Sequence, residues 1–334
     1  MNSVPRFFAF AFAAFCAVSP ARAELQTLHL TMPAIAVYYA PYMFAIEKGY
    51  YAEEGLTIDA TMAGGGAATP ALMSGTIDIS TSPAAALTAI IRGAPLKIVY
   101  TMADRSNYQL WSTQPDLVTL QDLKGKSVGI LSRGDTFEIA MRLTLLKAGL
   151  PQDWVSFTPL GVGDQVRAAA VASGSLPAVI VARSDVEPLR NTPALQRGHL
   201  VVDIEKTIQW PYTGVVVGDT LIKNKPDALL HFMRATVKGV RYVKAFRAET
   251  IALLRRREPQ ASEKQFGTDY DDSIEAMTAD GTASDAMIQQ DLDVRAQILN
   301  IPKDKMRPID QIYDYRAVRA VTKELDASGW KPTK

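Results

Sequence analysis

The sequence YAPYMFAIEKGYYAEEGL, residues 39–56, stands between two short apolar runs at residues 28–32 and 57–61. The two runs have the length and composition of β-strands, and the segment between them is typical of an amphipathic helix. Apolar runs and amphipathic segments go on alternating from Glu24 onward, which is the pattern of βα units with a mostly parallel sheet. The sequence therefore predicts an α/β fold.

The number of strands indicates more than one sheet. We expect strands at residues 28–32, 57–61, 77–81, 96–101, 127–131, 156–160, 178–182, 200–204 and 213–218. These are too many for one small sheet, and a chain of 334 residues exceeds the usual size of a single hydrophobic core. After residue 218 the apolar residues have helical spacing, and Pro226 stands where the first turn of a helix tolerates proline.

Two segments between the strand-rich blocks are rich in polar and aromatic residues. They are residues 102–112 and 206–213, and we expect both to cross between two lobes. The first lobe is then discontinuous, with residues 24–104 and 214–334, and it encloses a second lobe at residues 105–213. A cleft between two lobes is where a small ligand normally binds.

The N-terminus has the pattern of a secretory signal at residues 1–23. Arg6 precedes an apolar run at residues 7–18, and Ala21 and Ala23 provide a small-residue cleavage site. The run is shorter than the ~20 apolar residues that a transmembrane anchor needs. Since Phe15 precedes Cys16, a lipoprotein signal is disfavoured. We therefore expect a soluble periplasmic protein, cleaved after Ala23.

Composition then excludes several classes of function. Cleavage removes Arg6 and Arg22 and leaves 34 basic and 35 acidic residues, so no nucleic-acid partner is expected. Cys16 is the only cysteine and leaves with the signal, which excludes disulfides and thiolate chemistry. The three histidines, His29, His199 and His231, lack metal-ligand spacing. No metal site and no cofactor are expected.

Three segments carry a resemblance to a known family. Residues 39–56 are similar to the opening helix of the nitrate/sulfonate/taurine and thiamine-pyrimidine-precursor binding family (NMT1/THI5-like). Residues 70–79, PALMSGTIDI, resemble its next helix and strand, and residues 122–130, DLKGKSVGI, resemble the strand that begins its second lobe. The resemblance runs in order from about residue 28 to about residue 245, and several spaced motifs are more specific than one. The family usually has the pattern Gly-x-x-Asp-Ala before its seventh strand. This chain reads GSLPA there, at residues 174–178, and lacks the aspartate.

The resemblance implies a type II periplasmic-binding-protein fold, in which two α/β lobes are joined by two hinge crossovers and close over the ligand. It further implies the solute-binding component of an ABC importer, which binds a small molecule and works with a membrane permease. Because each lobe should have its own core and the two crossovers are the covalent hinges between them, we expect a monomer. Such a protein captures and releases its ligand without turnover.

Ligand contacts are expected beyond the C-terminal ends of the strands, where loops lead into helix N-termini. The candidates are Tyr38, Tyr39, Gly64, Gly65, Gly66, Thr81, Ser82, Ser132, Arg133, Gly134, Thr136, Trp210 and Tyr212.

Each group of candidates has a structural alternative. The three glycines would bring bare amides to a ligand or form a flexible turn. Residues 132–136 would bind an oxyanion with Arg133 as charge partner, unless Asp135 caps the helix. The hydroxyls of Thr81 and Ser82 would contact ligand or stabilise a turn.

The aromatic candidates have a similar ambiguity, since they would stack on a planar ligand or pack the fold and the hinge. The sequence thus predicts a binder of a small organic anion or a polar heterocycle. Two alternatives stay open, an enzyme of the same fold in thiamine-pyrimidine or menaquinone synthesis and a ligand-sensing partner of a membrane receptor. The cysteine-rich motif of the thiamine enzymes is absent from the mature chain.

Overall fold

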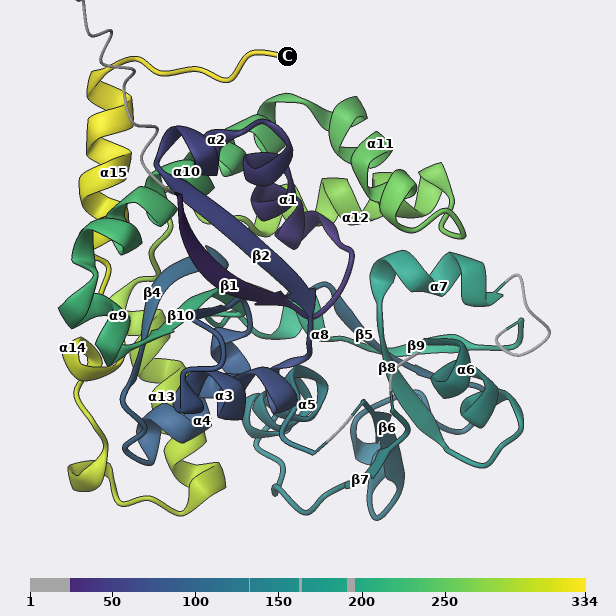
Figure 1. The fold of residues 1–334 in the computed structure, drawn as a ribbon. Helices are drawn as coiled ribbons and strands as arrows, with labels where there is room; N and C mark the ends of the chain where they lie inside the picture. The colour runs from purple at the N-terminus through teal and green to yellow at the C-terminus, as the bar shows by residue number, and fades with distance from the viewer. Residues whose placement is uncertain (1–24, 132, 162–163, 191–195) are drawn as a thin grey trace, which may run out of the picture.

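The computed structural model describes residues 25–131, 133–161, 164–190 and 196–334. The predicted signal sequence and Ser132 lie outside these ranges. Within them the chain forms two five-stranded sheets with helices packed around both (Figure 1). Among these residues, no helix combines the length and the apolar character needed to cross a membrane.

The first sheet has the strand order β2-β1-β3-β10-β4. Its strands are β1 (Gln26–Met32), β2 (Leu56–Met62), β3 (Ile79–Ser80), β4 (Leu96–Ala103) and β10 (Thr213–Gly218). β1 pairs in parallel with β2 and β3, whereas β10 is antiparallel to β3 and β4. A strand from late in the sequence therefore lies between two early ones.

The second sheet has the order β7-β6-β8-β5-β9. Its strands are β5 (Tyr108–Ser112), β6 (Ser127–Ile130), β7 (Ser156–Pro159), β8 (Ala178–Ala182) and β9 (His199–Asp203). β6 is parallel to β7 and β8, and β5 is antiparallel to β8 and β9. Both sheets are thus mixed, where the sequence predicted mostly parallel pairing.

Helices follow most strands, as the βα pattern predicts. Those up to residue 207 are η1 (Val37–Tyr39), α1 (Ala40–Glu47), α2 (Tyr50–Glu53), α3 (Gly65–Ser74), α4 (Pro83–Ile91), η2 (Gln121–Leu123), α5 (Thr136–Lys147), α6 (Asp164–Ala172), α7 (Arg183–Arg190) and α8 (Ile204–Thr207). The later ones are α9 (Asp219–Asn224), α10 (Pro226–Ala245), α11 (Arg247–Arg257), α12 (Glu263–Ala276), α13 (Asp285–Leu299), η3 (Lys303–Lys305), α14 (Ile309–Ile312) and α15 (Arg316–Ala327).

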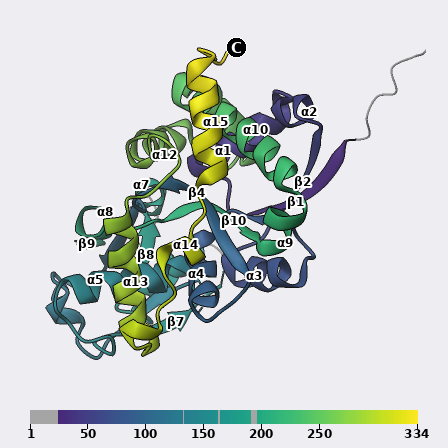
Figure 2. The same ribbon diagram turned by 90° about the vertical axis from the view of Figure 1, so that its left-hand side faces the viewer.

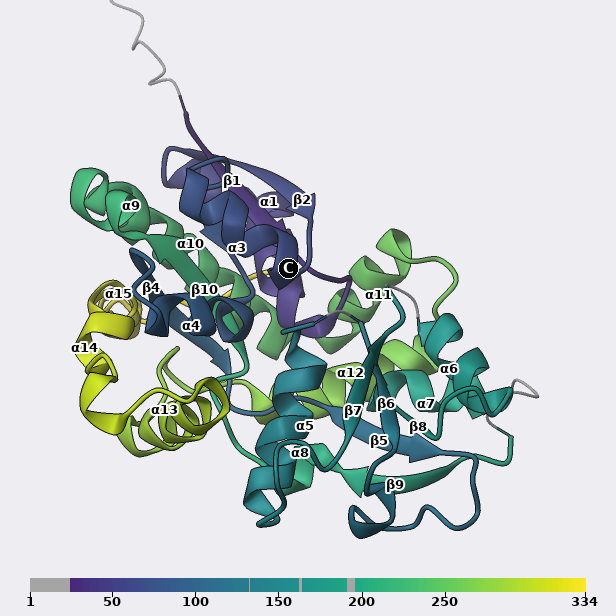
Figure 3. The same cartoon turned by 90° about the horizontal axis from the view of Figure 1, so that it is seen from below.

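The C-terminal helices hold the two halves together. α10 packs against α1, and α15 lies along α10 (Figure 2). Two further helices contact helices that connect strands of the second sheet, because α12 packs against α7 and α13 against α5 (Figure 3). The chain passes between the sheets at residues 104–107, the first crossing segment, and at residues 208–212, the second crossing segment.

One sequence expectation was wrong in part. Residues 102–112 were assigned to a crossover, but Tyr108–Ser112 form β5, paired on both sides. All five residues are buried, and the polar Gln109 is satisfied because its Oε1 accepts a hydrogen bond from Trp111 Nε1 at 2.9 Å. A strand that is buried on both faces lacks the polar–apolar alternation by which strands are recognised.

Candidate ligand-binding site

Three tyrosines and a threonine meet where the two sheets approach each other, and we call them the tyrosine junction. They are Tyr38 from η1, Tyr108 from β5, Thr136 from the start of α5 and Tyr212 from the second crossing segment. The Tyr108 hydroxyl lies 2.8 Å from both the Tyr212 hydroxyl and Thr136 Oγ1. The rings of Tyr38 and Tyr212 meet edge-on with centroids 5.6 Å apart.

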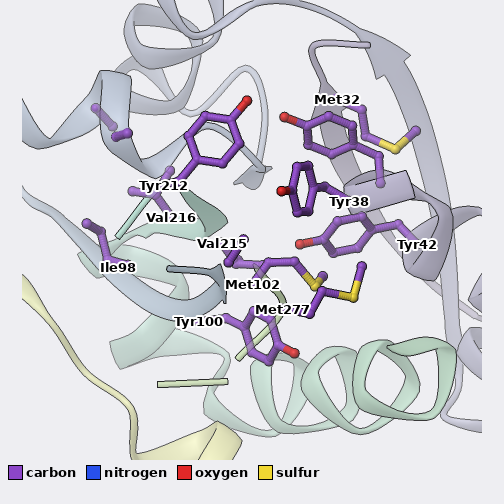
Figure 4. Close-up of a cluster of buried hydrophobic side chains, with 14 of the residues drawn as sticks. Met32, Tyr38, Tyr42, Ile98, Tyr100, Met102, Tyr212, Val215, Val216 and Met277 are labelled. Carbon is purple, nitrogen blue, oxygen red and sulfur yellow. The ribbon is translucent and has the colours of Figure 1, made fainter. Parts of the chain in front are cut away.

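All three rings of the junction are buried. Burial raises the pKa of Tyr212 well above its usual range, so the hydroxyls are neutral donors and acceptors. Figure 4 shows Tyr38, Tyr42 and Tyr100 around the methionines Met102 and Met277, with Tyr212 nearby. The junction is therefore the polar edge of an aromatic and sulfur-rich core.

A buried carboxylate on α12 holds the junction in place. Asp269 accepts hydrogen bonds from the Val37 amide at 2.9 Å, from Asn107 Nδ2 at 3.3 Å and from Ser273 Oγ at 3.3 Å. It thereby connects η1 to the first crossing segment. Burial raises the pKa of Asp269 to about 6. No sequence motif marks this residue.

A buried arginine lies next to the junction. Arg167 on α6 is 2% exposed, and its guanidinium lies 4.9 Å from the centre of the Phe137 ring. Burial lowers the pKa of Arg167, while the nearby Asp185 raises it. Sequence reasoning missed Arg167, although α6 follows β7 and the strand-end rule points to that position.

Helices α7 and α12 pack against each other, and α12 also packs against η1, which carries Tyr38. Gln265 Nε2 on α12 donates to Asp185 Oδ1 on α7 at 2.9 Å. Arg183, at the start of α7, lies 3.3 Å from Asp272 on α12, 3.3 Å from Asp203 and 2.5 Å from Glu205. The contacts of Gln265 with Asp185 and of Arg183 with Asp272 join α7 to α12.

The Asp185 contact predicts a pH dependence of stability. Burial in this contact raises the pKa of Asp185 from 3.8 to about 6, so between these values the folded state binds a proton that the unfolded chain does not. Stability should therefore rise as pH falls from 7 to 5, by roughly 1 kcal/mol for this group. Asp185→Asn keeps the acceptor for Gln265 and should remove that gain, as urea unfolding at both pH values would show. An unchanged pH dependence in the variant would contradict this origin.

Thr81, Ser82 and Tyr39 lie near strand ends of the first sheet. Thr81 Oγ1 donates to the Thr31 carbonyl at 3.0 Å, and the Thr81 carbonyl accepts from Thr213 Oγ1 at 3.1 Å. Ser82 is a buried residue at the N-cap of α4. Burial raises the pKa of Tyr39 to about 12.

The glycine run has a packing role. A Cβ on Gly65 would overlap Ala85 Cβ and lie 3.2 Å from Ser82 Cβ, so glycine is required where α3 and α4 approach each other. Gly64 and Gly66 are exposed at the start of α3. Gly65 therefore allows α3 and α4 to pack closely, whereas Gly64 and Gly66 on either side of it remain exposed.

The start of α5 has the arrangement of a capped helix. Asp135 Oδ1 accepts from the Glu138 amide at 2.8 Å, and the Gly134 amide donates to Glu138 Oε2 at 2.9 Å. The alternative that Asp135 caps the helix is confirmed. Arg133 is exposed, and among residues 133–136 Thr136 alone belongs to the junction.

Trp210 lies in the second crossing segment and connects it to the first. Its ring lies 5.4 Å from that of Tyr212, and its backbone amide donates to the Asp104 carbonyl at 2.9 Å. Within the described ranges, no group of three or more histidine, cysteine, aspartate or glutamate residues could hold a metal ion.

The chain is similar to known proteins in sequence and in fold. The family model described as NMT1/THI5 like matches residues 36–249, which is more than half of the chain. The riboflavin-binding protein RibY of Chloroflexus aurantiacus is 28% identical over 230 residues. That match covers 66% of this chain and 63% of the relative, so the chain spans slightly less than two thirds of that protein's length.

Solved structures show the fold. A putative periplasmic sulfonate-binding protein SsuA from Methylobacillus flagellatus has a TM-score of 0.70 at 18% identity, covering 93% of this chain and 98% of its own. The periplasmic nitrate-binding protein NrtA from Synechocystis has a TM-score of 0.66 at 15% identity, covering 93% and 92%. At these identities the likeness shows the fold alone, and the predicted periplasmic-binding-protein fold is confirmed.

Proposed function

Because the chain belongs to the NMT1/THI5-like family, we propose that it is the periplasmic solute-binding component of an ABC importer. It binds a small molecule at the tyrosine junction, closes over it and delivers it to a membrane permease. The observation that carries this proposal is the buried contact between the hydroxyls of Tyr108, from the second sheet, and Tyr212, from the second crossing segment just before β10 of the first sheet. The binding proteins among the structural neighbours support it.

The proposed closure uses two lobes. Residues 24–104 and 214–334 form one, residues 105–213 form the other, and the two crossing segments are the hinges. Contacts that join the lobes, Gln265 to Asp185 and Arg183 to Asp272, favour the closed state because they are lost when the lobes separate. A signal sequence cleaved after Ala23 exports the chain, which works as a monomer.

The proposed ligand is a polar planar heterocycle. Tyrosine rings offer faces for stacking, and their hydroxyls bond ring nitrogens or carbonyls. The helix amides that would bind a small anion already have side-chain partners at Gly134 and Glu138. The riboflavin-binding relative supports a heterocycle, whereas the sulfonate- and nitrate-binding neighbours have only the fold in common with this chain.

A binding screen tests the ligand class. Riboflavin, a hydroxymethylpyrimidine, taurine and nitrate would each be added to the mature protein in a thermal-shift assay. A ligand present at 100 times its dissociation constant should stabilise the fold by about 2.7 kcal/mol. Mass spectrometry of the recovered ligand should find it unchanged, because the proposal includes no turnover. Conversion of the ligand would instead favour the enzyme alternative.

Variants then separate the heterocycle from the anion. Tyr212→Phe removes only a hydroxyl and should weaken binding of a heterocycle about tenfold, because a buried polar group of the ligand loses its partner. Arg133→Ala serves as the matched control and should bind normally, since Arg133 is exposed. If calorimetry shows the reverse pattern, the ligand is an anion held by Arg133.

A further inference from the structure

The contact between α7 and α12 joins the two proposed lobes, and three carboxylates converge there on one arginine. Arg183, at the start of α7, lies 3.3 Å from Asp203, 2.5 Å from Glu205 and 3.3 Å from Asp272. Asp203 and Glu205 belong to the second lobe, whereas Asp272 comes from α12 of the first. The three carboxyl side chains are 11 to 17% exposed, so water screens their charges little. Asp272 is therefore brought among like charges when the lobes meet.

Other charged groups around this cluster leave its excess of negative charge in place. Arg105 lies 2.9 Å from Asp104 and 3.7 Å from Glu275, so its charge is already shared between two carboxylates. Lys206 lies 3.6 Å from Asp203, but it is exposed to solvent, where salt screens its charge. The contact is thus net negative whenever all of its carboxylates are ionised.

Asp185 is the carboxylate of α7 that faces α12. Gln265 Nε2 on α12 donates to its Oδ1 at 2.9 Å. Two further carboxylates, Asp269 and Glu258, act on Asp185 with the same sign, and Arg167 on α6 opposes them. Gln265 needs only one oxygen of the carboxyl group, so the hydrogen bond across the contact is kept when the other oxygen carries a proton.

Separation of the lobes would bring water to these carboxylates and relieve their repulsion. Because burial disfavours the charged form, the pKa of Asp185 is raised from 3.8 to about 6 at the contact, and burial raises the pKa values of Asp272 and Glu205 as well. In an open form the hydrated carboxyl group of Asp185 would return to its ordinary pKa of about 4. Between these values the closed form binds a proton that the open form does not. The closed form therefore gains stability as the pH falls through this window and loses it as the pH rises through 6.

We propose that the lobes take up a proton when they close, at Asp185 of the α7–α12 contact, so that acid favours the closed, ligand-holding form and a rising pH favours opening and release. This proposal rests on the closure that the proposed function includes. The carboxylates around Arg183 strengthen the effect, because they repel each other only while they are ionised and close together. Affinity should then fall with rising pH even for a ligand that does not titrate.

Spin labels on the two lobes measure the effect without any ligand. Residues 24–334 contain no cysteine, so Val118→Cys and Lys323→Cys introduce two unique labelling sites. Both positions are exposed, Val118 in the second lobe and Lys323 on α15 in the first. Electron–electron double resonance should give two distances, one for the closed and one for the open form. The ratio of closed to open protein should rise about tenfold from pH 7 to pH 5, because the pKa of one carboxyl group differs by about two units between the two forms.

Variants locate the proton. Asp185→Asn keeps the acceptor for Gln265 but cannot titrate, so it should lose most of the pH response and be about as closed at pH 7 as the unaltered protein is at pH 5. Asp272→Asn provides a second test if the first variant does not fold, since it removes the carboxylate that crosses to Arg183. Asp271→Asn is the matched control, because Asp271 lies on the same helix, is exposed and pairs with Arg247 at 3.0 Å. It should keep the full response.

Two results would overturn the proposal and leave the proposed function standing. One is a pair of distances whose ratio stays constant or falls on acidification, because closure would then take up no proton. The other is an equal pH response of Asp185→Asn and Asp271→Asn, which would place the proton elsewhere. A single distance at both pH values, before and after addition of riboflavin, would instead contradict closure itself, on which both proposals rest.

Discussion

Asp269→Ala should lower the free energy of unfolding by about 3 kcal/mol, because it leaves several buried donors without an acceptor. The Val37 amide, Asn107 Nδ2 and Ser273 Oγ all donate to this carboxylate. The desolvation that raises the pKa of Asp269 to about 6 is relieved at the same time, which keeps the loss from being larger. Urea unfolding at pH 7 measures the difference.

Ligand binding should fall together with stability in that variant, since η1 loses its connection to the first crossing segment and Tyr38 is no longer held beside Tyr212. Asp271→Ala is the matched control on the same helix. Asp271 is exposed and paired with Arg247 at 3.0 Å, and such a pair contributes at most about 1 kcal/mol. Equal losses in the two variants would mean that Asp269 does not organise the junction.

Gly239→Ala should destabilise the protein by about 2 kcal/mol, although alanine is the better helix former by about 1 kcal/mol. Gly239 lies inside α10 where this helix packs on α1. A Cβ there would overlap the Pro41 carbonyl oxygen and lie 3.0 Å from its carbonyl carbon. Both obstacles are backbone atoms, so the helices have to separate.

Separation of α10 from α1 would also displace η1, which directly precedes α1, and should weaken ligand binding. Gly267→Ala in α12 is the control, since its Cβ would meet only the flexible end of Arg247 at 3.1 Å. That variant should be neutral or slightly more stable. Urea unfolding of both variants decides between helix propensity and packing, because a stabilised Gly239→Ala would show that α10 and α1 adjust freely.

Local signals determined the secondary structure that could be predicted. The strands predicted at residues 178–182 and 213–218 coincide with β8 and β10. Apolar runs bounded by glycine or a charged residue can be recognised in a sequence as strands. The cap at Asp135 and the first-turn Pro226 follow from rules that involve residues no more than four apart. The sequence did not predict β5, because Tyr108 is aromatic and Gln109 is polar and both are buried.

The candidate site was predictable only where the strand-end rule applied. That rule found Tyr38, Thr136 and Tyr212, which the structure brings together, and it also named Arg133, which is exposed. The sequence prediction named no residue after β7, so it did not include Arg167 on the helix that follows this strand. The rule identifies loops, but it does not say which side chains of a loop turn inward.

The α/β class, the family and most of the order of strands and helices were predictable from the sequence alone, because these depend on composition and on spacing between near neighbours. Only the tertiary structure decided which groups meet. Asp269 bonds Val37 across 232 positions and Asn107 across 162. The partner of a buried polar group is set by the packing of whole helices on two sheets, and a single sequence contains no local pattern for such distant pairs.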